Sequence, residues 1–138
     1  MANAVYVPFR NGVLGSHTTR VDLDADNIKA VLTDHGADTP NVTTDDFLND
    51  ISAGTIATSA NFTGKTIGTV AAGVFDADNI TFTAVSGASV ESVNIYKDSG
   101  TAATSDLIAY FDTGTGLPVT PNGGDITVTW NASGIFTF

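Results

Sequence analysis

The residues that could do catalytic chemistry are few, and they do not form a recognisable set. Nucleophilic catalysis needs a nucleophile, a base and a group that orients the base, all within hydrogen-bond reach. The chain has no cysteine and only two histidines. His17 lies in a glycine-rich stretch and His35 in a turn-forming region, so we expect both to be exposed loop residues. The sequence therefore predicts no catalytic residues and no enzymatic activity.

Residues 59–66, Ser-Ala-Asn-Phe-Thr-Gly-Lys-Thr, are similar to the end of a phosphate-binding loop, in which backbone amides and a lysine cradle phosphates. Ser59 stands where that loop has its first glycine, and no helical pattern follows Thr66. A nucleotide site of this kind needs a strand, the loop and then a helix. We therefore interpret Gly64 and Lys65 as a turn or strand edge and expect no nucleotide cofactor.

Asp22, Asp24 and Asp26 match the first half of a calcium-binding loop, because carboxylates at alternate positions can converge on a hard cation. The second half of such a loop is missing, since Asn27 replaces the turn glycine and Thr33 stands where a bidentate glutamate is needed. We interpret these acids as solvated turn residues. A calcium ion in the Asp-rich turns stays open as an alternative, and otherwise we expect no metal and no cofactor.

The overall charge and hydropathy exclude several kinds of partner. The chain has 15 acidic and 5 basic residues, a net charge of −10 that disfavours a broad phosphate-binding face, so we expect no nucleic-acid partner. No stretch approaches the roughly 18 apolar residues of a membrane span, and the N-terminus does not have the pattern of a signal peptide. We therefore expect a soluble, unprocessed chain with no membrane partner.

The elements that must position any site are predicted to be strands. Of the 138 residues, 55 are Thr, Val, Ile, Phe, Tyr or Trp, which favour strands, whereas the chain has one Glu and no Gln. Asp, Asn, Gly and Pro supply abundant turn chemistry. The sequence predicts an all-β fold, a single β-sandwich or jelly-roll-like domain with at most one or two short helices.

Alternating apolar and polar residues mark about seven strands. The expected strands are residues 28–33, 62–70, 80–85, 90–97, 107–112, 126–130 and 135–138. The strongest hairpin joins 93–97 to 107–111 through a polar loop, and one short helix is expected at 45–51, capped by Thr43 or Thr44. The side chains expected to be largely buried are Phe82, Ile95, Phe111, Ile126, Val128 and Trp130.

The segment Asp-Ala-Asp-Asn-Ile occurs twice, at residues 24–28 and 76–80, and each copy precedes an alternating run. Asp and Asn side chains bond nearby backbone amides and make good turns before strands. Nothing that flanks the two copies repeats. We therefore favour two similar turns over a duplicated half-domain, which stays open as the alternative.

Several segments, taken together, resemble a group of small virion structural proteins of tailed bacteriophages. The segments that carry the resemblance are residues 26–33, 46–51, 95–98, 105–112 and 124–130. The resemblance implies a virion component without chemistry of its own. Among such components it favours a capsid decoration, or cement, protein on the exterior of the virion, made in the cytoplasm of the bacterial host.

The implied partners are the major capsid protein, which a decoration protein binds and stabilises, and the chain itself, in a homotrimer or another symmetric cluster. Two alternatives stay open. One is a tail or head-to-tail adaptor component, and the other is a carbohydrate- or receptor-binding β module.

Residues 1–20 differ in composition from the β domain expected at 21–138. They hold Arg10 and Arg20 and no acid, whereas the remaining residues carry 3 basic and 15 acidic side chains. We hypothesise an N-terminal arm that docks on the capsid shell or on a neighbouring subunit. The alternative is an edge strand of the same domain, where Pro8 is tolerated. The candidate interface residues are Val5, Tyr6, Phe9 and Arg10.

Overall fold

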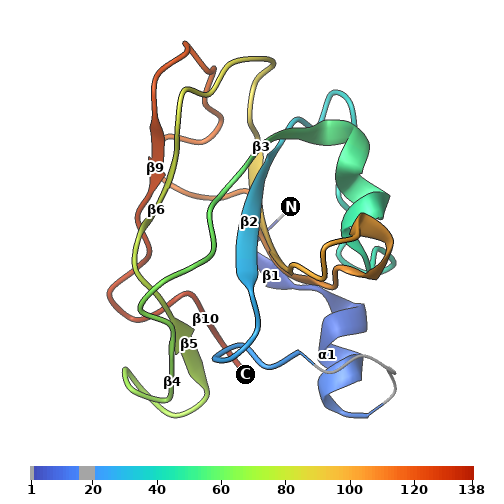
Figure 1. Ribbon diagram of the computed structural model, residues 1–138, viewed down its shortest axis with the longest axis vertical. Coiled ribbons are helices and arrows are strands. Elements are labelled where there is room, and N and C mark those ends of the chain that lie inside the picture. The colour runs from blue at the N-terminus through green and yellow to red at the C-terminus, as the bar shows by residue number, and fades with distance from the viewer. Residues whose placement is uncertain (1, 16–20) are drawn as a thin grey trace.

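A computed structural model describes residues 2–15 and 21–138 and shows antiparallel sheets with few helices (Figure 1). The described strands are β1 (Ala4–Val5), β2 (Ile28–Thr33), β3 (Thr55–Thr58), β4 (Thr66–Ile67), β5 (Val74–Asp76), β6 (Ile80–Phe82), β7 (Ser92–Lys97), β8 (Leu107–Phe111), β9 (Ile126–Val128) and β10 (Phe136–Thr137). The helical segments are α1 (Val7–Val13) and two 3-10 turns, η1 (Leu48–Gly54) and η2 (Ala102–Thr104). The predicted all-β class with few helices is confirmed.

The strands form three sheets arranged in layers. A five-stranded sheet in the order β1-β8-β7-β2-β3 lies in the middle. The small sheets β10-β5-β4 and β6-β9 lie on one side of it, and the helical segments lie on the other (Figure 1). Because both faces of the central strands are covered, nearly every residue of β2, β7 and β8 is buried.

The predicted hairpin is confirmed as the pair β7–β8. Val93 lies opposite Phe111 and Ile95 opposite Ala109. Strand β2 pairs with the other edge of β7 along its full length. This register places the apolar residues of three neighbouring strands in one core.

The region predicted as one strand at 62–70 contains only the two-residue strand β4 in the structure. Gly64 and Gly68 both have positive φ angles, +61° and +72°, which are incompatible with extended backbone. The Phe62 amide instead donates to the carbonyl of Ile28 at 2.8 Å and ties this loop to β2. Strands β3 and β5 were not predicted, because their runs are short and flanked by glycines.

The helix predicted at 45–51 is a 3-10 turn that begins later, at Leu48. Its start is not capped by a threonine. One carboxylate oxygen of Asp50 accepts the amides of Asp46 and Phe47, at 3.0 and 3.1 Å, and so satisfies two donors at the helix start.

The burial predictions separate into two groups. Phe82 and Ile95 are buried, whereas the other four side chains are partly buried and pack against the edge of the core. Those four are Phe111, Ile126, Val128 and Trp130. Alternation along β9 is as predicted, since its threonine is exposed between two half-buried residues. Pairing with β6 alone leaves this strand at the periphery.

The described N-terminal residues form an edge strand and a short helix, which corrects the expectation of an extended arm. Strand β1 pairs with β8, and the Tyr6 amide donates to the Ile108 carbonyl at 2.9 Å. Helix α1 follows at once, with Pro8 in its first turn, where a missing amide proton costs nothing. Arg20 and His17 lie outside the described residues.

The two Asp-Ala-Asp-Asn-Ile segments open strands of different sheets, β2 and β6. Their contacts also differ. Asn27 accepts a bond from the side chain of Asn61, at 3.3 Å, whereas Asn79 accepts the Trp130 amide, at 3.0 Å. The first copy forms a turn before β2, whereas the second leads from the end of β5 into β6 without one, so the expectation of two similar turns is wrong.

Candidate functional site

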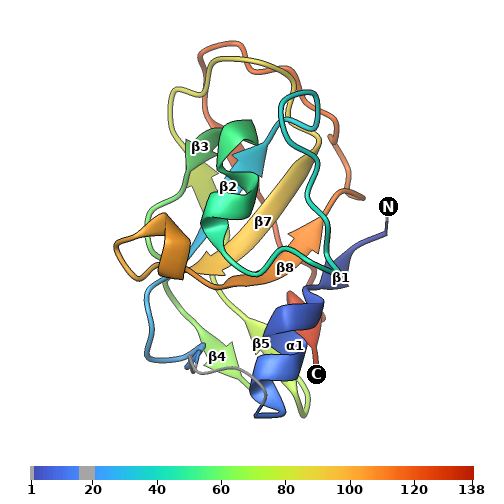
Figure 2. The same ribbon diagram turned by 90° about the vertical axis from the view of Figure 1, so that its right-hand side faces the viewer.

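The exposed large apolar side chains of the described chain gather at one end of the molecule. They are Val13 (57% exposed), Leu14 (83%), Ile67 (52%), Val70 (44%) and Phe138 (51%). They come from the end of α1, from β4 and the turn after it, and from the residue after β10. These elements lie at the same end in two perpendicular views (Figures 1 and 2). We call this surface the apolar end.

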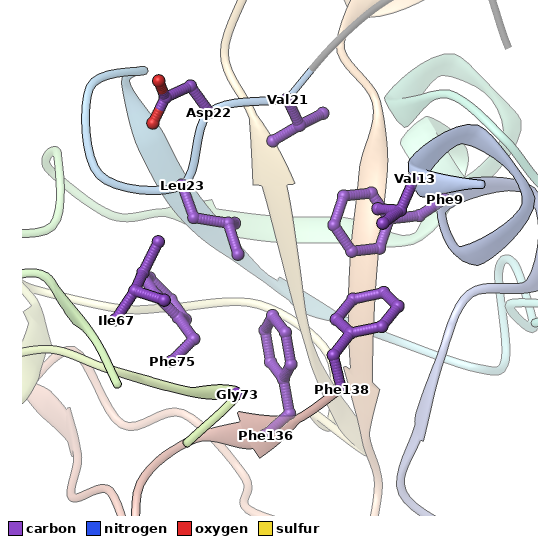
Figure 3. Close-up of a pocket in the computed structure, with 10 residues that line it drawn as sticks. All are labelled: Phe9, Val13, Val21, Asp22, Leu23, Ile67, Gly73, Phe75, Phe136 and Phe138. Atoms are coloured by element: carbon purple, nitrogen blue, oxygen red, sulfur yellow. The ribbon is translucent and has the colours of Figure 1, made fainter. Parts of the chain in front are cut away.

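A groove with a volume of about 630 Å³ lies within the apolar end (Figure 3). Apart from one aspartate and one glycine, the residues that line it are apolar. They are Phe9, Val13, Val21, Asp22, Leu23, Ile67, Gly73, Phe75, Phe136 and Phe138. Helix α1 forms one wall, and the β10-β5-β4 sheet with residues 21–23 forms the rest.

Aromatic rings in contact form part of the groove lining. The ring of Phe138 meets Phe9 edge-on, with centroids 5.6 Å apart, and lies 6.2 Å from the ring of Phe136. Phe136 in turn contacts Phe75, at 5.4 Å. Edge-to-face and tilted pairs at these distances are favourable geometries for aromatic side chains. The rings therefore hold one another in place and keep the groove open.

The backbone fixes the position of Phe138. Its amide donates to the Gly73 carbonyl at 3.0 Å. Gly73 has a φ of +75°, and a Cβ atom there would lie 2.7 Å from the carbonyl oxygen of Phe138. Only glycine fits both conditions. The close approach of these two segments thus builds one wall of the groove.

Two opposite charges lie on the elements that form the groove. Arg10 is exposed on α1 and has no ion-pair partner among the described residues. Asp22 is exposed on another wall, where its Oδ1 accepts the amides of Asp24 and Ala25 at 3.2 and 3.1 Å. The apolar end therefore combines an apolar hollow with one free cation and one anion.

The four interface residues predicted from the sequence have different positions. Tyr6 has no exposed surface and Phe9 is 7% exposed, because both pack into the chain's own core. Val5 is partly buried in β1, and Arg10 is exposed. Tyr6 is therefore unavailable as an anchor on a partner, whereas Phe9 lines the groove and Arg10, the next residue of α1, is exposed.

The structure contains a buried polar network that the sequence analysis missed. The Tyr6 hydroxyl donates to Asn94 Oδ1 at 2.7 Å, and Asn94 Nδ2 donates to Thr33 Oγ1 at 3.0 Å and Ser92 Oγ at 3.1 Å. Asn94, Thr33 and Ser92 are all 0% exposed. Burial raises the pKa of the Tyr6 hydroxyl, and the nearby Asp45 carboxylate adds to the rise. The network joins β1, β2 and β7 and serves to align them.

His35 is half-buried, which corrects the expectation of an exposed loop residue. Its ring stacks on Tyr110, with centroids 6.1 Å apart, and its Nε2 lies 2.9 Å from Ser92 Oγ. The arrangement differs from a catalytic triad in two respects. Ser92 is 0% exposed, and Glu91 accepts a bond from the backbone amide of His35, at 2.8 Å.

The aspartates of the calcium-like segment bond to the protein itself. Asp26 Oδ2 accepts the Asp22 amide at 2.7 Å and pairs with Lys97 Nζ at 3.1 Å. Burial opposes ionisation of Asp26, but the Asp22 amide and Lys97 together hold its pKa below the ordinary value. The described residues contain no cluster of three or more His, Asp or Glu side chains that could hold a metal ion.

The phosphate-loop-like segment is also occupied by structural contacts. Lys65 Nζ donates to the backbone carbonyl of Asp26, and Thr63 Oγ1 donates to Asp78 at 2.9 Å. The lysine therefore fastens the turn before β2, in agreement with the interpretation of residues 64–65 as a turn.

Comparison with protein-family models gave no match, and comparison with curated proteins also gave none. Among the described helices, none is long and apolar enough to cross a membrane.

Proposed function

We propose that the chain is a structural protein of a tailed-bacteriophage virion, a capsid decoration protein that binds and stabilises the shell of the major capsid protein. In this role it has no catalytic activity and acts from the exterior of the capsid. It acts in many copies and contacts itself in a symmetric cluster. The resemblance of five sequence segments to such proteins supports the assignment, as does the kind of surface that the domain exposes.

The single observation that carries the proposal is the apolar end. Proteins that remain monomeric rarely gather their exposed apolar side chains on one surface, and such a patch marks an interaction site. Here the patch gathers the large apolar side chains that are exposed in residues 2–15 and 21–138, whereas the polar clusters described above are tied up in structural hydrogen bonds. An assembly component needs such a contact surface and needs no reactive group.

The alternative of a carbohydrate-binding module has less support. Sugar binding usually uses an exposed aromatic face, and Trp130 is the only tryptophan. Its ring lies 5.8 Å from the rings of both Phe62 and Phe111, and its Nε1 donates to the Asp78 carbonyl at 3.2 Å. These contacts bind the half-buried indole to residues of the chain itself.

Cryo-electron microscopy of the particle that carries this chain tests the proposal. We expect many copies of the domain over the outer surface of the shell, at positions where capsid subunits meet. A ring at one vertex would instead indicate a head-to-tail adaptor, and a few copies on the tail would indicate a tail component. Either of these results would overturn the decoration assignment.

A matched binding experiment gives a second readout. Particles stripped of the chain should regain it from solution at saturable sites and should then resist heating better. Full occupancy without any gain in particle stability would contradict the stabilising role.

A further inference from the structure

We propose that the groove of the apolar end seats a second copy of this chain, so that the protein forms a dimer with two-fold symmetry. The inference deepens the proposed function and rests on it insofar as a decoration protein contacts copies of itself. Its physical basis is that the apolar end is complementary to itself in shape and in charge.

The shape argument comes from helix α1. Phe9 and Val13, four residues apart, lie on the side of the helix that lines the groove. Arg10 and Leu14, also four apart, form the neighbouring stripe, and Leu14 is 83% exposed. The largely exposed side chain of Leu14 therefore follows directly, in the chain, on Val13, which lines the apolar hollow (Figure 3).

Two-fold pairing uses this arrangement twice. An interface of this kind presents the same surface on both subunits, so each protruding group must meet a hollow in the same patch of the other copy. With the symmetry axis at the rim of the groove, Leu14 of each copy enters the groove of the other. The exposed side chains of Val13, Ile67 and Phe138 are then covered as well.

The charges favour the same pairing. Within residues 2–15 and 21–138, Arg10 has no ion-pair partner, and Asp22 lies on a wall of the groove away from α1 (Figure 3). When Leu14 enters the neighbouring groove, Arg10 on the same stripe comes to the neighbouring rim, where Asp22 stands. Each dimer would gain two such pairs. Two molecules that each carry a net charge of −10 repel each other, so these local pairs also decide the orientation of approach.

Sedimentation velocity of the purified full chain over a wide concentration range tests the inference without any phage particle. We expect a reversible monomer–dimer equilibrium. Leu14→Asp should weaken association at least tenfold, because it places an unpaired charge in the groove. The matched control is Ala88→Asp, on an exposed residue, which should leave association unchanged. Ala88 belongs to the segment between β6 and β7, and that segment extends to the end of the molecule away from α1 (Figure 1).

A charge exchange tests the orientation. Arg10→Asp alone should weaken association several-fold, and combining it with Asp22→Arg should restore most of the loss. Circular dichroism and thermal melting of each variant verify that the fold is kept. The inference is overturned by a chain that stays monomeric up to millimolar concentration, by a trimer or open-ended polymer, or by Leu14→Asp that associates like the Ala88 control.

These outcomes separate the inference from the proposed function. A strictly monomeric chain that still covers capsid shells would refute the two-fold pairing and keep the decoration role. A dimer that never binds shells would refute the decoration role and keep the two-fold pairing.

Discussion

Replacing Tyr6 by Phe tests whether the N-terminal residues belong to the folded core. The Tyr6 hydroxyl donates a 2.7 Å bond to Asn94, and both residues are 0% exposed. The substitution keeps the ring and leaves the Asn94 oxygen without its donor. An unsatisfied buried acceptor costs about 1–3 kcal/mol, so we expect the free energy of unfolding to fall by this amount.

Urea unfolding, followed by circular dichroism or tryptophan fluorescence, measures the change. The matched control is Tyr96→Phe, because Tyr96 is also buried but its hydroxyl makes no hydrogen bond among the described residues. That control should change the free energy of unfolding by less than about 0.5 kcal/mol. If Tyr6→Phe changes the free energy of unfolding as little as the control does, Tyr6 is not held in the core. That result would favour the interpretation of the N-terminus as an arm.

Two further predictions concern stability. Burial raises the pKa of Tyr6 and, to about 12, that of Tyr96, so the folded state keeps its phenol protons where the unfolded state loses them. The contribution of these tyrosines to the free energy of unfolding should therefore be constant below about pH 10. Above that pH the free energy of unfolding should fall, by roughly 1.4 kcal/mol per pH unit for Tyr6. Urea titrations at increasing pH measure this change. Gly73→Ala should lower the melting temperature more than Gly68→Ala, because both have positive φ but only the former places a Cβ against Phe138. Equal losses would show that the contact with Phe138 is unimportant.

The central hairpin could be predicted because the sequence patterns of its two strands and of the loop between them lie close together in the chain. Residues 93–97 and 107–111 each have a clear apolar pattern, and a polar loop joins them. Once they pair, β2 adds at the free edge of β7, where its own apolar residues are buried, and β1 adds at the edge of β8. Short strands such as β3 and β5 carry too few residues for any period to be visible, and long-range pairing alone defines them.

The apolar end could not be predicted in this way. Val13, Ile67 and Phe138 lie far apart in the sequence. Each belongs to a run of apolar residues that would equally predict a buried position in the core. Whether such a side chain is buried depends on which elements cover it in three dimensions. The buried network around Asn94 has the same property, because a polar residue in a strand predicts an exposed face unless its partners are known.

The exposed groove follows from the length of the element beside it. Helix α1 has seven residues, which corresponds to a length of about 10 Å, too short to cover the β10-β5-β4 sheet. Val13 and Leu14 at its end are largely exposed, so in the isolated chain they contribute little to the stability of the fold. Their apolar surface becomes stabilising only when another molecule removes it from water. The fold of a single chain therefore leaves this apolar surface exposed to water, as the proposed assembly role requires.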